Sequence, residues 1–219
     1  MHNILILGSG PIAELSALPF DEIYYANGAI SRSLDIKADI KRQNLVLSDM
    51  IFTERNHGCK KVKSMLEKIV LDDLVIYQTK KNLNLKIFND LKVLDVQYKS
   101  YSYVGRYRRS LLVLKSVNFT KVLVYLLQQT GVKKTITEIL YFLWKGNFRP
   151  LKVSTGCLAL LEAVNGAQND SQFYLAGISF SDNGSHFYDE EFPFVGHGNQ
   201  DRLMLKTLRS DIRSRTTIL

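Results

Sequence analysis

Residues 152–177 read KVSTGCLALLEAVNGAQNDSQFYLAG, and they decide the fold. A turn of small residues, Ser154-Thr155-Gly156, precedes an apolar helix, and a short apolar strand then runs from Phe173 to Ala176. Helices that alternate with buried strands are typical of an α/β protein with a parallel sheet. In such sheets, ligands bind just past the carboxyl ends of the strands. We therefore expect the residues that follow this strand, Gly177 and Ser179, to lie at a ligand site.

Three earlier strands end in the same way. The apolar runs 3–7, 22–26 and 44–47 are typical of strands buried in a parallel sheet. If these strands are parallel neighbours, the residues at their ends form a polar rim along one edge of the sheet, which is a ligand site. The alternative is that these residues only cap and turn the chain. The rim residues are Gly8, Ser9 and Gly10 after the first strand, Asn27 after the second and Ser48 after the third.

The turn after the first strand, GSGP at 8–11, contains two glycines. A strand, a glycine turn and a helix beginning near Ile12 would place backbone N–H groups and a helix N-terminus against a phosphate. The strict dinucleotide pattern G-x-G-x-x-G is not met, because its third glycine is missing. A dinucleotide-dependent oxidoreductase is therefore the weaker interpretation, and a structural turn without a ligand stays open.

The chain is basic, with 29 Lys and Arg against 21 Asp and Glu and a net charge of +8. Such a charge suits a phosphorylated ligand or an anionic membrane surface, although it could also serve only solubility. No nucleic-acid fingerprint is visible, so we expect no nucleic-acid partner. Cys59 and Cys157 lack metal-type spacing, and Cys157 is expected to be a small core residue. No signal peptide or membrane-spanning run is seen, and a cytoplasmic protein is expected.

The segment 97–150 differs from the rest and is expected to be a helical lid or insertion. It would divide the α/β domain into a nucleotide-binding part, 1–96, and a second part with the catalytic loop, 151–219. We expect two or three helices here, with a break at 130–134. Its tyrosines and arginines could close over an anionic ligand, face acidic lipid headgroups or simply be solvated. These residues are Tyr101, Tyr103, Arg106, Tyr107, Arg108 and Arg109.

Two further helices are expected from apolar periodicity. One spans 57–70 and has a basic face, and the other follows Asp201 in RLMLKTLRSDI. The basic tail after it, RSRTTIL, is expected to be frayed.

A single histidine, His197, lies in FVGHGNQD at 194–201. An imidazole with a pKa near neutrality can take a proton from a hydroxyl group, which makes His197 a candidate general base. A histidine beside glycines and aromatic residues can equally be a packed or capping residue.

Five motifs together resemble the bacterial sialyltransferases of glycosyltransferase family 42, the Campylobacter-type alpha-2,3-sialyltransferases. They are GSGP at 8–11, Asn27, STG at 154–156, LAGISF…NGS at 175–185 and FVGHGNQD at 194–201. The resemblance covers both ends of the chain but not the middle. It implies a Rossmann-like, GT-A-like variant domain with a mostly parallel sheet and a lid.

The resemblance also implies an activity. This is the metal-independent, inverting transfer of a sugar acid from a CMP-activated donor to a sugar hydroxyl, with no cofactor. His197 would be the general base of this reaction. Lys152 stands where the family has an arginine, and Tyr188 would assist the leaving group if its loop shifts. The implied donor nucleotide-binding residues are Gly8, Ser9, Gly10, Asn27, Ser48, Ser154, Thr155, Gly156, Gly177 and Ser179.

The sequence departs from the family where the leaving group is assisted. The family has tyrosines at the positions of Ser181 and Phe187, whose hydroxyl groups help the CMP phosphate to leave. The loss of such donors slows a reaction, because one contact of this kind can be worth about 10²-fold or more. His186 could replace them or be a solvent residue. The alternative function is therefore a non-catalytic relative that binds a nucleotide or a sugar phosphate.

The partners implied are a CMP-sugar donor and a glycan acceptor of lipooligosaccharide or capsule synthesis. The basic charge and a lipid-linked acceptor predict peripheral contact with the inner face of the cytoplasmic membrane. Members of the family often form tetramers, so a homo-oligomer is implied without a fixed state.

Overall fold

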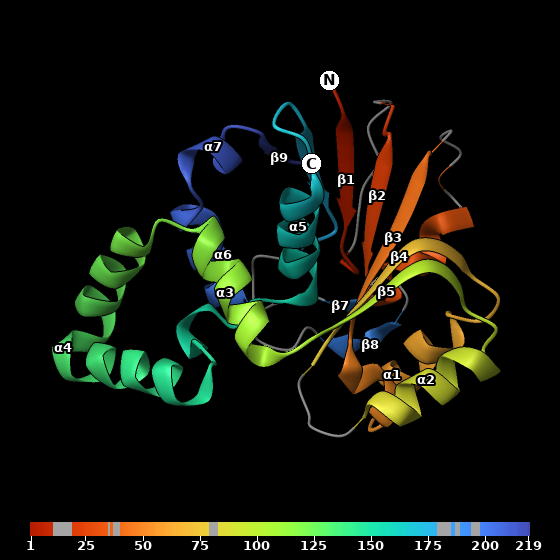
Figure 1. The fold of residues 1–219 in the computed structure, drawn as a ribbon, viewed down its shortest axis with the longest axis horizontal. Helices are drawn as coiled ribbons and strands as arrows, with labels where there is room; N and C mark the ends of the chain where they lie inside the picture. Colours follow the sequence, from red (N-terminus) through yellow and green to blue (C-terminus); the bar gives the residue numbers. More distant parts are fainter. Residues whose placement is uncertain are drawn as a thin grey trace.

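Seven strands form one sheet in the order β5-β4-β3-β2-β1-β6-β9, and every pairing in it is parallel (Figure 1). The computed structural model describes residues 1–10, 19–34, 36, 40–78, 83–178, 185–186, 189–193 and 198–219. The predicted α/β, Rossmann-like fold is confirmed. The strands are β1 (Asn3–Leu7), β2 (Glu22–Ala26), β3 (Arg42–Ser48), β4 (Val70–Tyr77), β5 (Gln97–Val104), β6 (Gln172–Ala176) and β9 (Thr216–Ile218).

The central strands are apolar on both faces because helices cover both faces of the sheet. In β1, Ile4 and Ile6 pack on one side, whereas Leu5 and Leu7 pack on the other, and all four are fully buried. Successive side chains of a strand point to opposite faces, so burial on both sides requires a continuous apolar run. This is why the sequence of β1 shows no polar alternation.

Two layers of helices enclose the sheet (Figure 1). One core lies between the sheet and α3, α5, α6, α7 and the first part of α4, and the other lies between the sheet and η1, η2, α1 and α2. The first layer comprises α3 (Arg106–Ser116), α4 (Phe119–Lys145), η3 (Arg149–Leu151), α5 (Thr155–Gly166), α6 (Gly198–Thr207) and α7 (Ser210–Arg213). The second comprises η1 (Asn27–Leu34), η2 (Asp49–Thr53), α1 (His57–Ser64) and α2 (Asn84–Val93). A separate antiparallel pair joins β7 (Ser185–His186) to β8 (Asp189–Pro193).

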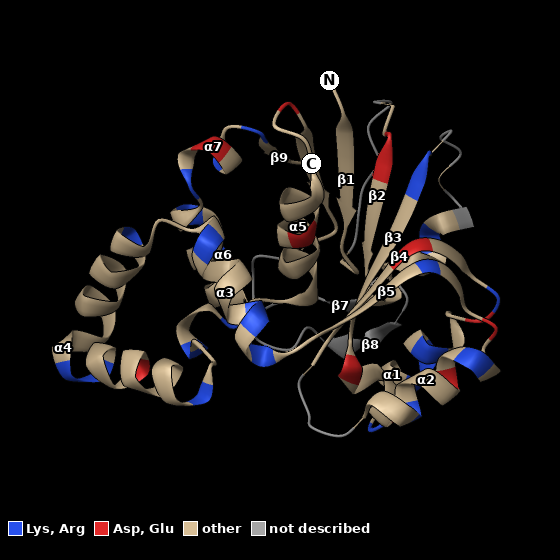
Figure 2. Cartoon of the chain, viewed as in Figure 1, with Lys and Arg blue, Asp and Glu red and all other residues tan. Residues whose placement is uncertain are grey.

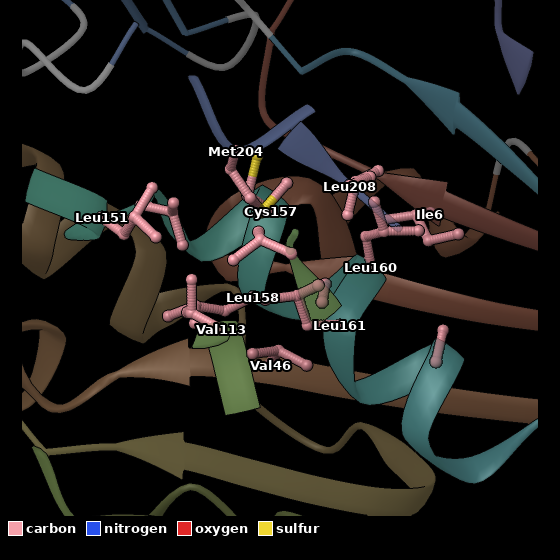
Figure 3. Packing of buried hydrophobic residues seen from close by; sticks show 14 of the residues in the cluster. Ile6, Val46, Val113, Leu151, Cys157, Leu158, Leu160, Leu161, Met204 and Leu208 are labelled. Atoms are coloured by element: carbon pink, nitrogen blue, oxygen red, sulfur yellow. The ribbon is translucent and has the colours of Figure 1, made fainter. Parts of the chain in front are cut away.

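Helix α5 lies at the centre of the first core. Figure 3 shows Cys157, Leu158 and Leu161 of this helix among side chains from the sheet, α3 and α6. Cys157 is fully buried, as predicted. Burial, together with the nearby Asp201 carboxylate, raises the pKa of the Cys157 thiol well above its usual range, so this thiol is a packing group and not a nucleophile.

Two strands of the seven-stranded sheet contradict the sequence predictions. Residues 97–104, placed in the helical segment, form the edge strand β5 beside β4. The prediction of a frayed tail is wrong, because 216–218 pair with β6 as β9. The predicted break at 130–134 is confirmed, since Gly131 has φ 75° and ψ 169° inside α4. The proposed boundaries at 96 and 150 stay predictions.

The expected helix at 57–70 is shorter, because α1 ends at Ser64. Among the helices of the described ranges, none is long and apolar enough to cross a membrane.

Candidate functional site

The turn after β1 lies directly against the end of β6. The backbone N–H of Gly8 donates to the carbonyl oxygen of Ala176 (2.8 Å), and that of Gly10 donates to the carbonyl oxygen of Gly177 (2.6 Å). A Cβ atom at Gly8 would lie 2.3 Å from the Gly177 oxygen, which is closer than atoms can approach. Gly177 has φ 64°, in the left-handed region that favours glycine. Position 8 therefore needs glycine so that the two strand ends can meet.

The meeting point of β1 and β6 is where the strand order reverses. From β1 the chain adds β2, β3, β4 and β5 on one side, and later adds β6 and β9 on the other. Since β1 and β6 are parallel, their carboxyl ends lie at the same edge of the sheet. Such a switch point is where open α/β sheets bind ligands.

The N-terminus of α5 reaches the same place. Ser154 caps this helix, because its Oγ accepts a hydrogen bond from the Cys157 N–H (3.3 Å), and the first turn contains no acidic residue. A Cβ atom at Gly156 would lie 3.1 Å from Cγ1 of Ile178, the second residue after β6. The positive end of the helix dipole and its backbone N–H groups favour an anion at this position, and the Asp201 carboxylate already accepts one of these N–H groups, that of Ser154.

A buried carboxylate joins α5 to α6. Asp201, in the first turn of α6 and 1% exposed, accepts a hydrogen bond from the backbone N–H of Ser154 (2.8 Å). This contact brings Asp201, the last residue of the FVGHGNQD motif, to Ser154 of the STG motif. The sequence analysis quoted Asp201 within its motif but gave it no role, and its position directly before a predicted helix was the available signal.

The polar residues predicted at the strand ends lie along one edge of the sheet, and two of their side chains accept hydrogen bonds from backbone N–H groups. Oδ1 of Asn27 accepts a hydrogen bond from the Ser48 N–H (3.1 Å), and Oγ of Ser48 accepts from the Met50 N–H (3.3 Å). Asn27 has φ 49°, so it turns the chain after β2. Both residues therefore cap or turn the chain, which was the alternative that the sequence left open. Within the described ranges, the Asn27 Nδ2 group donates no hydrogen bond, which leaves a donor for a ligand.

A buried arginine lies at this edge as well. Arg109 of α3 is only 7% exposed, and its guanidinium makes no hydrogen bond or ion pair with the residues that the structure describes. Burial lowers the pKa of this group, while Tyr77 and Asp49 act in the opposite direction. Arg109 lies in the first turn of α3, directly after the end of β5, so it lies at the carboxyl edge of the sheet on the side of β4 and β5. A buried charge without a paired carboxylate is costly and points to an anionic ligand.

The remaining predicted residues divide into two groups. Ser9 follows β1, Thr155 is the first residue of α5, and Lys152 is exposed two residues before the Ser154 cap. Ser179, Tyr188 and His197 lie outside the described residues, as do Ser181, Phe187 and Phe194. In the ranges that are described, no group of three His, Cys, Asp or Glu side chains could hold a metal ion.

The family resemblance rests on the motifs alone. No protein-family model, no curated protein and no solved structure matches this chain. What the structure adds is the set of contacts between the motifs. Gly10 meets Gly177, Ser154 meets Asp201, and Gly156 lies against Ile178.

Proposed function

We propose that this chain is a glycosyltransferase that uses a CMP-activated nonulosonic acid or related keto-sugar acid. One observation carries the proposal: the described residues of four motifs from distant parts of the chain meet at one switch point, through the Gly10–Gly177 and Ser154–Asp201 hydrogen bonds. A turn of backbone N–H groups, a helix N-terminus and a buried arginine suit a donor with two anionic groups, a phosphate and a carboxylate.

In this proposal the donor phosphate binds between the glycine turn and the N-terminus of α5. Arg109 binds the second anionic group. The acceptor hydroxyl oxygen attacks the anomeric carbon of the sugar acid, the bond from that carbon to the phosphate oxygen breaks, and CMP leaves with the electron pair. The hydroxyl proton passes to the His197 imidazole. Lys152 and Tyr188 assist the departing phosphate.

The proposed setting is the inner face of the cytoplasmic membrane, where the acceptor is a lipooligosaccharide or capsule glycan. The basic charge of the chain suits such a surface.

The first experiment is calorimetric titration of the folded protein with CMP, UDP and NAD, without added metal. We expect CMP alone to bind. His197→Ala should lose transfer from CMP-sialic acid while it keeps CMP affinity, and transfer retained by this variant would overturn the assignment of the base. Failure of CMP to bind would overturn the proposal itself.

A second candidate, a relative that binds nucleotides without transfer, is favoured by Ser181 and Phe187, which stand in place of the family tyrosines. It predicts CMP binding with no release of CMP from CMP-sialic acid, with or without an acceptor glycan. Detectable transfer would exclude it.

A dinucleotide-dependent oxidoreductase is the third candidate. Ala13 stands where the third glycine of the pattern falls, and some dinucleotide sites accept alanine there. Against it, the residue after β2 is Asn27, whose Oδ1 already accepts the Ser48 N–H, and not an acid that could hold a ribose. Binding of NAD in the titration would favour this candidate.

A further inference from the structure

Helix α4 extends away from the sheet as a bent arm (Figure 1). Its φ and ψ angles leave the helical region at Gly131, which divides it into a first segment, 119–130, and a second segment, 132–145. The first segment contributes Val122 and Leu126 to the core. The second segment contributes no fully buried apolar side chain to either core. It is therefore the part of the arm with the least contact to the rest of the domain.

The second segment presents an apolar stripe to solvent. Val132, Ile136, Leu140 and Leu143 are each more than half exposed. Their spacing of four, four and three residues places them on one face of the helix. Trp144, which is 76% exposed, lies beside them. Solvent-facing apolar residues at helical spacing form a contiguous patch, and patches of this kind mark interaction sites.

Contacts on the other faces fix the direction of the stripe. Phe142 stacks on Tyr107 of α3, with ring centroids 6.2 Å apart, and meets Phe148 edge-on at 5.9 Å. The Arg149 guanidinium donates two hydrogen bonds to the Glu138 carboxylate, at 2.9 and 2.7 Å. The stripe is thus held outward by packing on the opposite side and is not a frayed end.

The charges near the stripe indicate what kind of surface it binds. Lys133 is exposed at the edge of the stripe, the Lys145 ammonium lies 3.5 Å from the centroid of the Trp144 ring, and the one acidic residue of α4, Glu138, is paired with Arg149. Figure 2 shows α4 largely uncharged, with blue near the bend and at its ends. A second copy of this chain would bring the same positive charge, whereas an anionic lipid surface is complementary. Tryptophan with flanking lysines is typical of helices that lie at a membrane–water interface.

We propose that the second segment of α4 docks the protein on anionic lipid bilayers, with Val132, Ile136, Leu140, Leu143 and Trp144 in the interface and the lysines on the headgroups. This proposal does not depend on the proposed transferase activity, because none of these residues belongs to the switch-point site.

Trp144 is the single tryptophan of the chain, so its fluorescence reports on the arm alone. With vesicles of phosphatidylglycerol and phosphatidylcholine at low salt, we expect a blue shift and co-sedimentation. Phosphatidylcholine vesicles should give neither, and about 0.5 M salt should reverse binding because it screens the lysines. The double variant Leu140→Ser, Leu143→Ser should partition at least about tenfold less.

The matched control is the double variant Leu85→Ser, Val93→Ser on α2. Both residues are at least as exposed as the stripe residues, so the total loss of exposed apolar surface is similar. This control should bind vesicles like the unchanged protein, and circular dichroism checks that both variants are folded. The α4 variant should also bind CMP as the unchanged protein does. Weaker vesicle binding with normal CMP affinity would assign the loss to α4 and not to the switch-point site.

Two results would overturn the proposal. One is the absence of a blue shift and of co-sedimentation with anionic vesicles. The other is a blue shift without vesicles that grows with protein concentration, together with a dimer in analytical ultracentrifugation. In that case a second copy covers the stripe.

Discussion

Gly8 is the residue on which the switch point depends most. We expect Gly8→Ala to lower the free energy of unfolding by about 1–3 kcal/mol or more, because the new methyl group would overlap the Gly177 carbonyl. CMP binding should weaken with it. Gly166→Ala is the control, since its Cβ would meet only the Tyr24 hydroxyl at 3.6 Å. Urea unfolding of both variants, followed by titration, tests this. Equal effects of the two changes would contradict it.

Gly8 is needed for stability, whereas the buried charge of Arg109 is expected to lower the free energy of unfolding. Arg109→Met removes a buried charge that lacks a partner among the described residues, so the free energy of unfolding should stay level or rise. Binding of CMP-sialic acid should fall by about tenfold or more, because a charged hydrogen bond is lost. Arg108→Met, at an exposed neighbour, should change neither quantity. A loss of stability in Arg109→Met would mean that the charge supports the fold through Asp49.

The burial of Arg109 could not be predicted from the sequence. RYRR at 106–109 has the composition of a solvated helix start, and only the packing of α3 on the sheet turns one of its arginines inward. Asn27 and Ser48 show the converse. Their positions at strand ends were predicted, but their hydrogen bonds to the backbone depend on which strands are neighbours.

At the scale of elements, the N-terminus of α5 is both a helix cap and part of the site. Ser154→Ala should cost about 1 kcal/mol of stability through the lost cap, and it should also weaken CMP binding. Asn118→Ala removes an equivalent cap from α4, where Oδ1 accepts the Lys121 N–H. It should cost a similar free energy but leave CMP binding intact. Thermal unfolding and titration of both variants separate the two roles, and CMP affinity equal to that of the unchanged protein in Ser154→Ala would remove α5 from the site.

Elements with two buried faces were predicted well, and edge elements were not. β1, β2 and β6 are continuous apolar runs, which identify a buried parallel strand without further information. Half of the residues of β5 are exposed and its sequence mixes tyrosines with polar residues, whereas β9 has only three residues. Each pairs with the sheet along one side only, so neither sequence carries the apolar run of a central strand.

At the scale of the whole molecule, the strand order is what creates the site. Each local motif was visible in the sequence, but the pairing of β1 with β6 follows from contacts across most of the chain. The resemblance to a family supplied an expectation about function. The structure adds the contacts between the described parts of these motifs at one switch point, and the function stays a proposal.

The pairing of β1 with β6 also has a kinetic consequence. Non-local contacts form slowly, because much chain entropy is lost before they are made. During synthesis β1 is complete long before β6, so one side of this apolar strand stays unpaired while the intervening residues are added. An unpaired strand edge is prone to aggregate, so we expect the yield of refolded protein to fall as the protein concentration rises. The candidate site at the carboxyl edge is assembled in the same late step that pairs β1 with β6, so partly folded chains would lack it.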